Sequence, residues 1–271
     1  MRNFNLEKVC NSLYTKEIVD YLQTLYPMEL ASSFDYGKVG LQFGALSKEV
    51  KKVMITLDGT SAVVDEALEN NCDMLICHHP FLFNSIINLD YNSPLGKKML
   101  KVFKNELNIF AMHTNFDCAI NGMNDYLASL LKLENVYSVP EIPTSDSYFR
   151  IGDIEKRSLA EFAYYVKEVF NEEAIRVVGD FDKQVKKVAI LGGSGGNYAV
   201  TAKKLGCDCI ITGEVKQNNA IDAVEYNMAI IEVSHSVEAL FKEYIKNQLS
   251  EQFKDVEFIV SKKDVNPFKC L

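Results

Sequence analysis

The stretch KKVMITLDGTSAVVDEALENNCDMLICHH, residues 51–79, decides the fold of this chain. Its apolar run at 53–57 predicts a strand, the turn residues at 58–61 precede a helix expected over 62–70, and the apolar run at 74–77 predicts a second strand. Strands that alternate with helices of about 10 to 15 residues are typical of βαβ units and indicate a parallel sheet.

A second stretch has the same organisation. Residues 186–214 align with 51–79 without gaps, and 8 of the 29 paired positions are identical. This similarity is compatible with duplication and also with two independent βαβ units, which share apolar positions whatever their origin. Both alternatives predict the same fold class, α/β with two related domains built from parallel βαβ units. The apolar run at 229–233 then corresponds to 109–112, and His235 to His113.

Other segments fill the two domains. The further expected elements are a helix at 5–25, a Gly-rich loop and short strand at 34–44, a helix at 94–107, a strand at 108–112, a helix at 121–133, a strand at 148–151 and a helix at 159–170. Pro140 and Pro143 lie in a polar stretch at 134–148, which indicates a linker. We therefore expect one domain over 1–140 and another over 141–271.

Composition limits the possible functions. The 271 residues are 48% apolar and 24% charged, and the net charge is -8 without a basic tract. This argues against a sequence-independent grip on nucleic acid, whose binding depends on its phosphates. The N-terminus lacks the apolar segment of a signal peptide and no apolar run reaches the length of a membrane span, so we expect a cytoplasmic protein with no membrane partner.

Seven cysteines without a Cys-x-x-Cys pair favour reduced, buried thiols over disulfides or a thiolate zinc site.

All four histidines lie where a metal ligand would lie. His78, His79, His113 and His235 each follow a short apolar run that predicts a strand. Ligands of open α/β sheets bind beyond the carboxyl ends of such strands, where Asp58 also lies. A lone histidine at a strand end is usually a hydrogen-bonded surface residue, but that alternative does not explain why the whole histidine complement falls there.

Carboxylates accompany two of these motifs. Asp117 follows His113, and Glu238 follows His235. Asp117 could instead cap the following helix, and Glu238 could favour the first turn of its own helix through the helix dipole. Imidazole and carboxylate together suit zinc, iron, manganese or nickel. Neighbouring side chains on extended backbone point to opposite sides, so His78 and His79 could serve two divalent ions.

Two further motifs have open roles. The loop at 192–196, Gly-Gly-Ser-Gly-Gly, follows a strand and precedes a helix, so it could cradle a phosphate or form a tight turn that packs the helix on the sheet. Glu214 and Lys216 lie at the end of the next strand and are candidate substrate-binding residues. A lysine exposed to solvent without a ligand is the alternative for Lys216.

The chain resembles a known family in these motifs. They are Val-Gly-Leu-Gln-Phe-Gly at 39–44, Cys-His-His-Pro at 77–80, His-Thr-Asn-Phe-Asp at 113–117, Gly-Gly-Ser-Gly-Gly at 192–196 and Thr-Gly-Glu-Val-Lys at 212–216. Together they resemble the GTP cyclohydrolase I type 2 homologues, also called Nif-type dinuclear metal-centre proteins. The resemblance implies two α/β domains, a two-metal site in the cleft between them, and a homohexamer.

The resemblance also implies site residues. The metal ligands would be His78, His79, Asp117, His235 and a following glutamate, while His113 and Asp58 would lie behind them. The family's last motif is usually His-x-x-x-Glu, whereas here Glu238 stands three residues after His235 and Ala239 takes the usual place. Asn218 stands where many members have a histidine.

The leading functional hypothesis is a metal-dependent hydrolase in which a hydroxide that bridges two divalent metal ions attacks a nucleotide-like or phosphoester substrate. The family name suggests ring opening of GTP. One alternative is a non-catalytic metal-binding ring that stores or delivers metal or serves as a protein-interaction scaffold. Another is a vestigial site in a structural protein.

Overall fold

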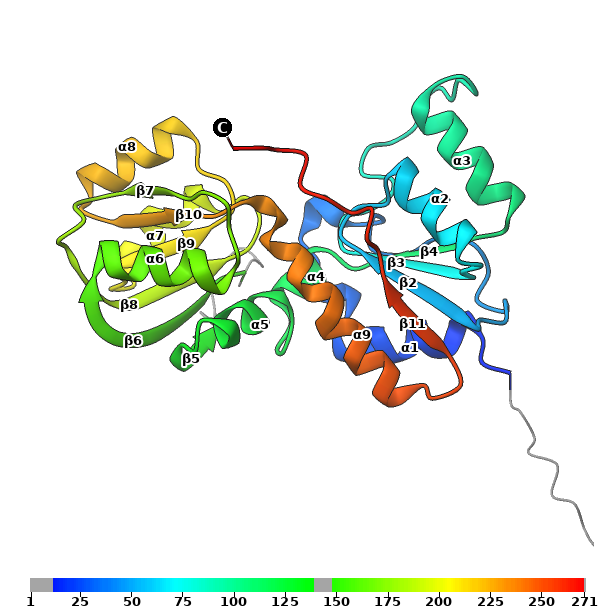
Figure 1. Cartoon of the computed structure of the whole chain (residues 1–271), viewed down its shortest axis with the longest axis horizontal. Coiled ribbons are helices and arrows are strands. Elements are labelled where there is room, and N and C mark those ends of the chain that lie inside the picture. The colour runs from blue at the N-terminus through cyan, green and yellow to red at the C-terminus, as the bar shows by residue number, and fades with distance from the viewer. Residues whose placement is uncertain (1–11, 139–147, 271) are drawn as a thin grey trace, which may run out of the picture.

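The computed structural model describes residues 12–138 and 148–270, which form two lobes with one sheet in each (Figure 1). The first sheet has the order β1-β4-β3-β2-β11. Its strands are β1 (Gly40–Phe43), β2 (Lys52–Thr56), β3 (Met74–Cys77), β4 (Asn108–Ala111) and β11 (Glu257–Val260). All of its pairings are parallel except that of β1 with β4.

The second sheet has the order β5-β6-β8-β9-β10-β7. Its strands are β5 (Glu134–Ser138), β6 (Arg150–Ser158), β7 (Arg176–Val178), β8 (Gln184–Leu191), β9 (Cys209–Thr212) and β10 (Ala229–Glu232). Strands β8, β9 and β10 are parallel, whereas β5, β6 and β7 pair antiparallel to their neighbours. The expected α/β class is therefore confirmed, with antiparallel strands added at the edges of parallel centres.

Helices cover both faces of each sheet. They are α1 (Thr15–Leu25), α2 (Ser61–Glu69), α3 (Pro94–Lys104), α4 (Thr114–Cys118), α5 (Met123–Leu130), α6 (Leu159–Val169), α7 (Ala199–Lys204), α8 (Gln217–Glu225) and α9 (Phe241–Gln252). Helices α1, α5, α6 and α9 pack into one core to which both sheets contribute, α2 and α3 cover the other face of the first sheet, and α7 and α8 cover the other face of the second. The central strands are buried on both faces, which explains their continuous apolar runs.

The two βαβ units share their register. Val53 pairs with Met74 in the first sheet, and the aligned Val188 pairs with Cys209 in the second. Asp73 accepts hydrogen bonds from the backbone N–H groups of residues 51 and 52, and the aligned aspartate at 208 does the same for 186 and 187. The repeat seen in the sequence is therefore also a repeat in three dimensions.

The same register corrects one predicted correspondence. Ala111 pairs with Cys77, and Glu232 pairs with Thr212, which is the residue aligned with Cys77. Counting on from these pairs, His113 corresponds to Ser234 and not to His235. The correspondence predicted from the sequence was wrong by one residue, because an apolar run indicates where a strand lies but not which residues pair across the sheet.

The N-terminal helix and the linker also differ from the prediction. Helix α1 begins at Thr15, because Leu13 and Tyr14 instead pair with the extended segment at 49–50. The part of the predicted helix at 5–11 lies outside the described residues. Of the predicted linker, 134–138 forms strand β5 against β6, and 139–147 lies outside the described residues.

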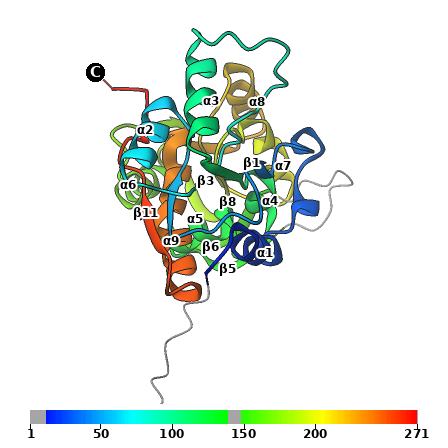
Figure 2. The ribbon, with the colours of Figure 1, turned by 90° about the vertical axis from the view of Figure 1, so that its right-hand side faces the viewer.

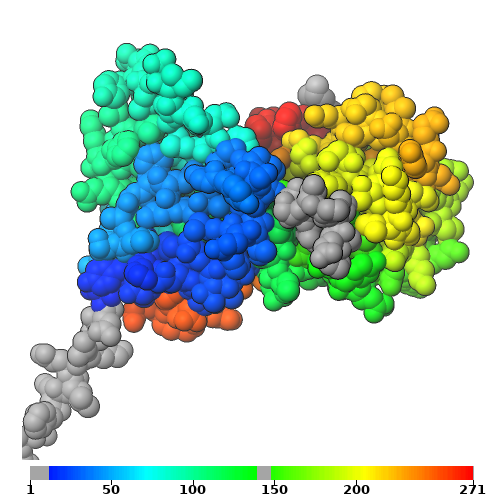
Figure 3. Space-filling model, turned by 180° about the vertical axis from the view of Figure 1, so that it is seen from behind, coloured from blue at the N-terminus to red at the C-terminus, as the bar shows by residue number. Residues whose placement is uncertain are grey.

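The last strand of the chain returns to the first lobe. Strand β11 joins the first sheet beside β2, and β5 belongs to the second sheet, so sheet membership does not follow the predicted boundary at 140 (Figure 1). In the end-on view, β11 lies beside α9, the helix that precedes it (Figure 2). Seen from behind, the C-terminal segment lies where the two lobes meet (Figure 3). None of the helices in the described segments has the length and apolar character needed to span a bilayer.

Candidate metal centre

The carboxyl ends of the parallel strands of both sheets converge on one cluster. His78 and His79 follow β3, His113 follows β4, and His235 follows β10. Three overlapping groups bring together side-chain atoms within 4.8 Å of one another: His78 with His79 and His113; His79 with His235 and Glu238; and His78 with Asp117 and Glu238. All five residues that the resemblance implies as ligands therefore lie together, and His113 joins them.

His78 presents a bare nitrogen to two carboxylates. Its ring is fully buried, and Nδ1 lies 2.9 Å from the Met112 carbonyl oxygen, to which it donates. Nε2 then carries the lone pair, and it lies 3.7 Å from Asp117 Oδ1 and 3.6 Å from Glu238 Oε2. These distances are too long for hydrogen bonds.

His78 and Asp117 have the unsatisfied buried atoms that a cation would need. Among the described side chains, His78 Nε2 and Asp117 Oδ1 are buried atoms without a hydrogen-bond partner. Leaving such groups unsatisfied costs about 1 to 3 kcal/mol each. Two donors that each lie about 2.0 to 2.2 Å from one ion can stand up to about 4 Å apart, so one cation between them would satisfy both.

Each of the other three histidines is oriented by a carboxylate. Nδ1 of His79 lies 2.8 Å from Asp58 Oδ1, Nδ1 of His113 lies 2.7 Å from Asp35 Oδ2, and Nδ1 of His235 lies 2.7 Å from Glu214 Oε1. These bonds engage Nδ1 and leave Nε2 as the nitrogen available to the cluster. Metal-binding histidines are typically held in this way.

Glu238 lies at the middle of the cluster. Its Oε2 is 3.6 Å from His78 Nε2, 3.2 Å from His79 Nε2 and 3.1 Å from His235 Nε2. It belongs to a 3-10 helix, η4 (His235–Leu240), in which residues three apart eclipse one another. The His-x-x-Glu spacing therefore places both side chains on one face, as His-x-x-x-Glu would in an α-helix.

The Gly-rich loop makes room for this carboxylate. A Cβ on Gly192 would lie 3.0 Å from Glu238 Oε1, and a Cβ on Gly193 would lie 2.6 Å from the same oxygen. Gly193 also has φ +64, which favours glycine. This contact with Glu238 is a further role beside the two that the sequence left open for the loop, a phosphate cradle and a turn that packs the helix on the sheet, and those two stay predictions.

The imidazoles have separate protonation states. Burial lowers the pKa of His78 to about 4. For His79, burial alone would lower the pKa, but hydrogen bonds with Asp58 and Glu238 outweigh it and raise the pKa to about 10. For His235, burial is likewise outweighed by the contact with Glu238, and the pKa rises to about 9. A cation on these two nitrogens must therefore displace a proton from each.

The pKa values of the two buried carboxyl groups are shifted in opposite directions. Burial and the neighbouring Glu238 charge raise the pKa of Asp117 well above its ordinary value. Burial alone would also raise the pKa of Glu238, but the surrounding imidazoles hold it well below its ordinary value. Glu238 is thus the more acidic of the two carboxyl groups, and Asp117 is the carboxylate that gains most from a nearby cation.

A pocket of about 540 Å³ opens over the cluster. His79, His113, Asp117, His235 and Glu238 line it together with an aromatic wall formed by Phe34, Phe83, Tyr148 and Tyr198. The Lys38 ammonium lies 4.0 Å from the centre of the Phe83 ring and 5.7 Å from that of Phe34. Lys38 does not line the pocket itself, but it places a positive charge beside two of the aromatic rings that do.

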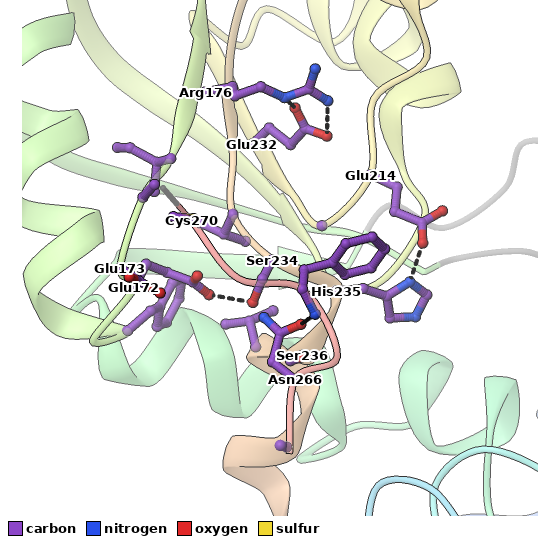
Figure 4. A pocket seen from close by; sticks show the side chains of 18 of the residues that line it. Glu172, Glu173, Arg176, Glu214, Glu232, Ser234, His235, Ser236, Asn266 and Cys270 are labelled. Atoms are coloured by element: carbon purple, nitrogen blue, oxygen red, sulfur yellow. Dashed lines mark hydrogen bonds and ion pairs between the residues drawn. The ribbon is translucent and has the colours of Figure 1, made fainter. Parts of the chain in front are cut away.

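A second cavity of about 920 Å³ is lined by His235, which belongs to the cluster, and by Glu214, which holds that histidine (Figure 4). Lys216 lines this cavity and is absent from the lining of the pocket over the cluster. The Glu214 carboxylate is bonded to His235, as the dashed line in Figure 4 shows. The substrate-binding roles predicted for Glu214 and Lys216 remain predictions.

Sequence reasoning assigned no role to several residues of this site. Asp35 is fully buried and holds His113, from which it is separated by 78 positions. Its acidic character before the Gly-rich strand was the only signal, and no spacing rule links it to His113. The aromatic wall gave no signal either, because exposed and buried phenylalanines look alike in sequence.

Comparisons with known proteins show the family of the chain. A family model described as Duf34/NIF3 (NGG1p interacting factor 3) matches residues 13–267. A GTP cyclohydrolase 1 type 2 homolog from Clostridium acetobutylicum is 32% identical over 268 residues, covering 95% of this chain and 99% of that protein. The crystal structure of a Bacillus cereus protein related to NIF3 superposes with a TM-score of 0.88 at 26% identity, covering 96% of this chain and 99% of that one. Reduced HcgD from Methanocaldococcus jannaschii gives a TM-score of 0.78 at 29% identity, with 93% and 98% covered.

Proposed function

Because the chain belongs to the Duf34/NIF3 family, we propose that it is a dinuclear metal-dependent hydrolase that acts on a nucleotide-like or phosphoester substrate. The observation that carries the proposal is the common orientation of the four histidines. Each has Nδ1 engaged by a carboxylate or a carbonyl, and Nε2 remains for a shared centre that also holds two buried carboxylates.

The candidate ligands would divide between two cations. His78 and Asp117 would hold one cation, His79 and His235 would hold the other, and Glu238 touches both pairs and would bridge them. This division follows two of the three overlapping groups and uses His78 Nε2 and Asp117 Oδ1, which have no hydrogen-bond partner among the described residues. The nitrogen and oxygen donor set suits zinc, iron, manganese or nickel. His113, held by Asp35, lies beside the first pair.

When bound, two such cations would lower the pKa of a water molecule and polarise the bond under attack. The chain's own residues do the rest. Asp58, Asp35 and Glu214 keep the imidazoles in one orientation, and Gly192 and Gly193 leave room for Glu238.

The pocket supports a substrate with a flat ring and an anionic group. Phe34 and Phe83 are 53% and 46% exposed at the mouth, which suits stacking with a planar ring. Lys38 between them suits an anion such as phosphate. The printed names of the bacterial relatives, GTP cyclohydrolase 1 type 2 homolog, support including GTP among the candidates.

The proposal is tested first by measuring the metal content of the protein and then by assaying its catalytic turnover. Untagged protein purified without added metal is analysed for transition metals, as wild type and as Glu238→Ala. We expect about two ions per wild-type chain and a clear loss in the variant. Loaded protein is then assayed with GTP, nucleoside monophosphates and p-nitrophenyl phosphate. Hydrolysis of one of these supports the enzyme, whereas two bound ions without turnover favour the non-catalytic metal-binding ring. No metal even after reconstitution would refute both.

We also propose that the chain forms a homohexamer, as the family resemblance implies. Light scattering after gel filtration should then give about six times the 30.6 kDa mass of one chain. A monomeric mass at micromolar concentration would exclude this assembly.

A further inference from the structure

We propose that Asn124 is a positioning residue that fixes the separation of Asp117 and Glu238. This inference rests on the proposed metal centre and adds a residue that touches neither cation nor substrate. Asn124 lies in α5, and its side chain is fully buried.

All of the polar groups of the Asn124 side chain are engaged. Nδ2 donates to the carbonyl oxygens of Asp117 at 3.1 Å and Tyr148 at 2.7 Å, and Oδ1 accepts from the backbone N–H of Gly192 at 2.8 Å. Two acceptors on one side and a donor on the other fix the orientation of the amide. One side chain therefore ties the helix that carries Asp117 to the Gly-rich loop.

That loop in turn contacts Glu238. A Cβ on Gly192 would lie 3.0 Å from Glu238 Oε1 and 3.1 Å from Glu238 Cγ, so the backbone at 192 sets how close the carboxylate can come. Asn124 thus holds the backbone of Asp117 on one side and the wall behind Glu238 on the other. Both carboxylates face His78 Nε2, at 3.7 and 3.6 Å.

The chain contains a matched control in Asn108. This side chain is also buried, donates to Thr15 Oγ1 at 2.6 Å and to the Ala45 carbonyl oxygen at 3.0 Å, and accepts from the Ala45 N–H at 3.3 Å. It begins β4, at the end of the strand opposite His113. Loss of either asparagine removes a comparable network, but only Asn124 is connected to the metal centre.

The experiment compares Asn124→Ala, Asn124→Asp and Asn108→Ala with wild type. Affinity for Co²⁺ is measured by chelator competition, the d–d absorption of the Co²⁺ protein is recorded, and Tm is measured without metal. We expect both Asn124 variants to bind one of two ions about 10- to 100-fold more weakly, with altered d–d absorption. Asn124→Asp keeps the size and the acceptor but loses both donors, so it also serves if the alanine variant does not fold.

Asn108→Ala should lower Tm by a similar amount while keeping both affinities and the wild-type spectrum. Equal weakening by the Asn108 and Asn124 variants, or wild-type affinity in both Asn124 variants, would overturn the positioning role. If wild type binds two ions and the Asn124 variants bind both ions as tightly as wild type does, this inference fails while the proposed function stands. If wild type binds none, the proposed function fails and takes this inference with it.

Discussion

Asp117 Oδ1 and Glu238 Oε2 face the same nitrogen, Nε2 of His78, from 3.7 and 3.6 Å. Counting from the ladder pairs of the two sheets, these acids also occupy equivalent positions, each six residues after the end of the third parallel strand of its unit. Each sheet therefore supplies one carboxylate to a buried imidazole that belongs to the first. The centre depends on both lobes, and changes in either should reach it.

The 3-10 geometry at Glu238 predicts the result of moving its carboxylate by one position. The double substitution Glu238→Ala with Ala239→Glu restores the His-x-x-x-Glu spacing. Because η4 aligns residues three apart, the moved carboxylate should point away from His235. We expect metal content per chain to fall as far as in Glu238→Ala alone. Wild-type metal content in the double variant would show that this segment adopts α-helical spacing when metal binds.

Gly193→Ala should disrupt the centre through the packing of its loop. The new Cβ would meet Glu238 Oε1 at 2.6 Å, and φ +64 adds a backbone cost of about 1 to 2 kcal/mol. Gly206→Ala is the control, because Gly206 has φ +84 but no atom within 4 Å of the added Cβ. Both variants should lose stability in urea titrations, and only Gly193→Ala should lose metal. Equal metal content in the two would contradict the packing role.

The pH dependence should differ between metal-free and metal-loaded protein. The raised pKa values of His79 and His235, about 10 and about 9, mean that their protonated forms stabilise the metal-free fold. That contribution is fully present below about pH 6.5, the unfolded value, and is lost as pH rises through about 9 to 10. Metal requires the deprotonated rings, so its affinity should increase over the same range.

Melting curves of EDTA-treated and reconstituted protein between pH 6.5 and 10 test this expectation. Tm of the metal-free protein should fall with pH, and the gap between the two forms should widen. A metal-free Tm that stays level or rises would contradict the assigned charge states.

The aromatic mouth predicts an effect on substrate binding. Phe83→Ala and Lys38→Ala should raise KM for an active substrate by about fivefold, since each contact is worth about 1 kcal/mol. The kcat value should change less, because neither residue is a candidate metal ligand, although the Phe83 ring packs edge-on against that of His113. Phe181→Ala provides a control, since Phe181 is 60% exposed and lies outside the pocket. An unchanged KM in both Phe83→Ala and Lys38→Ala would show that these two residues do not contact the substrate.

Strand identities and ligand candidates could be predicted from sequence because both depend on local patterns. The continuous apolar run ending at His78 predicts a buried strand, and strand ends in α/β sheets predict where ligands gather. His235 and Glu238 could be named as ligands, but their alignment depends on a 3-10 turn that no spacing rule anticipates. Asp35 and Asn124 act across 78 and 68 positions of sequence, so only the folded chain reveals them.

The edges of the sheets were the least predictable part of the fold. Strand β5 is short and largely exposed, so it resembles a loop in its composition. Strand β11 pairs with β2 across about two hundred residues, and no local pattern indicates such a partner. Which segment pairs at the edge of a sheet depends on which strands of the folded chain still have unpaired backbone groups, and this cannot be read from a local stretch of sequence.

The place of β11 has a consequence for how the protein is made. Val53 pairs with Phe258, so strand β2 obtains its second neighbour only from the last segment of the chain. While the ribosome is still synthesising the second lobe, the first sheet ends in an unpaired strand whose N–H and C=O groups are open to other chains. A ribosome that stops before residue 257 therefore releases a product with an aggregation-prone edge.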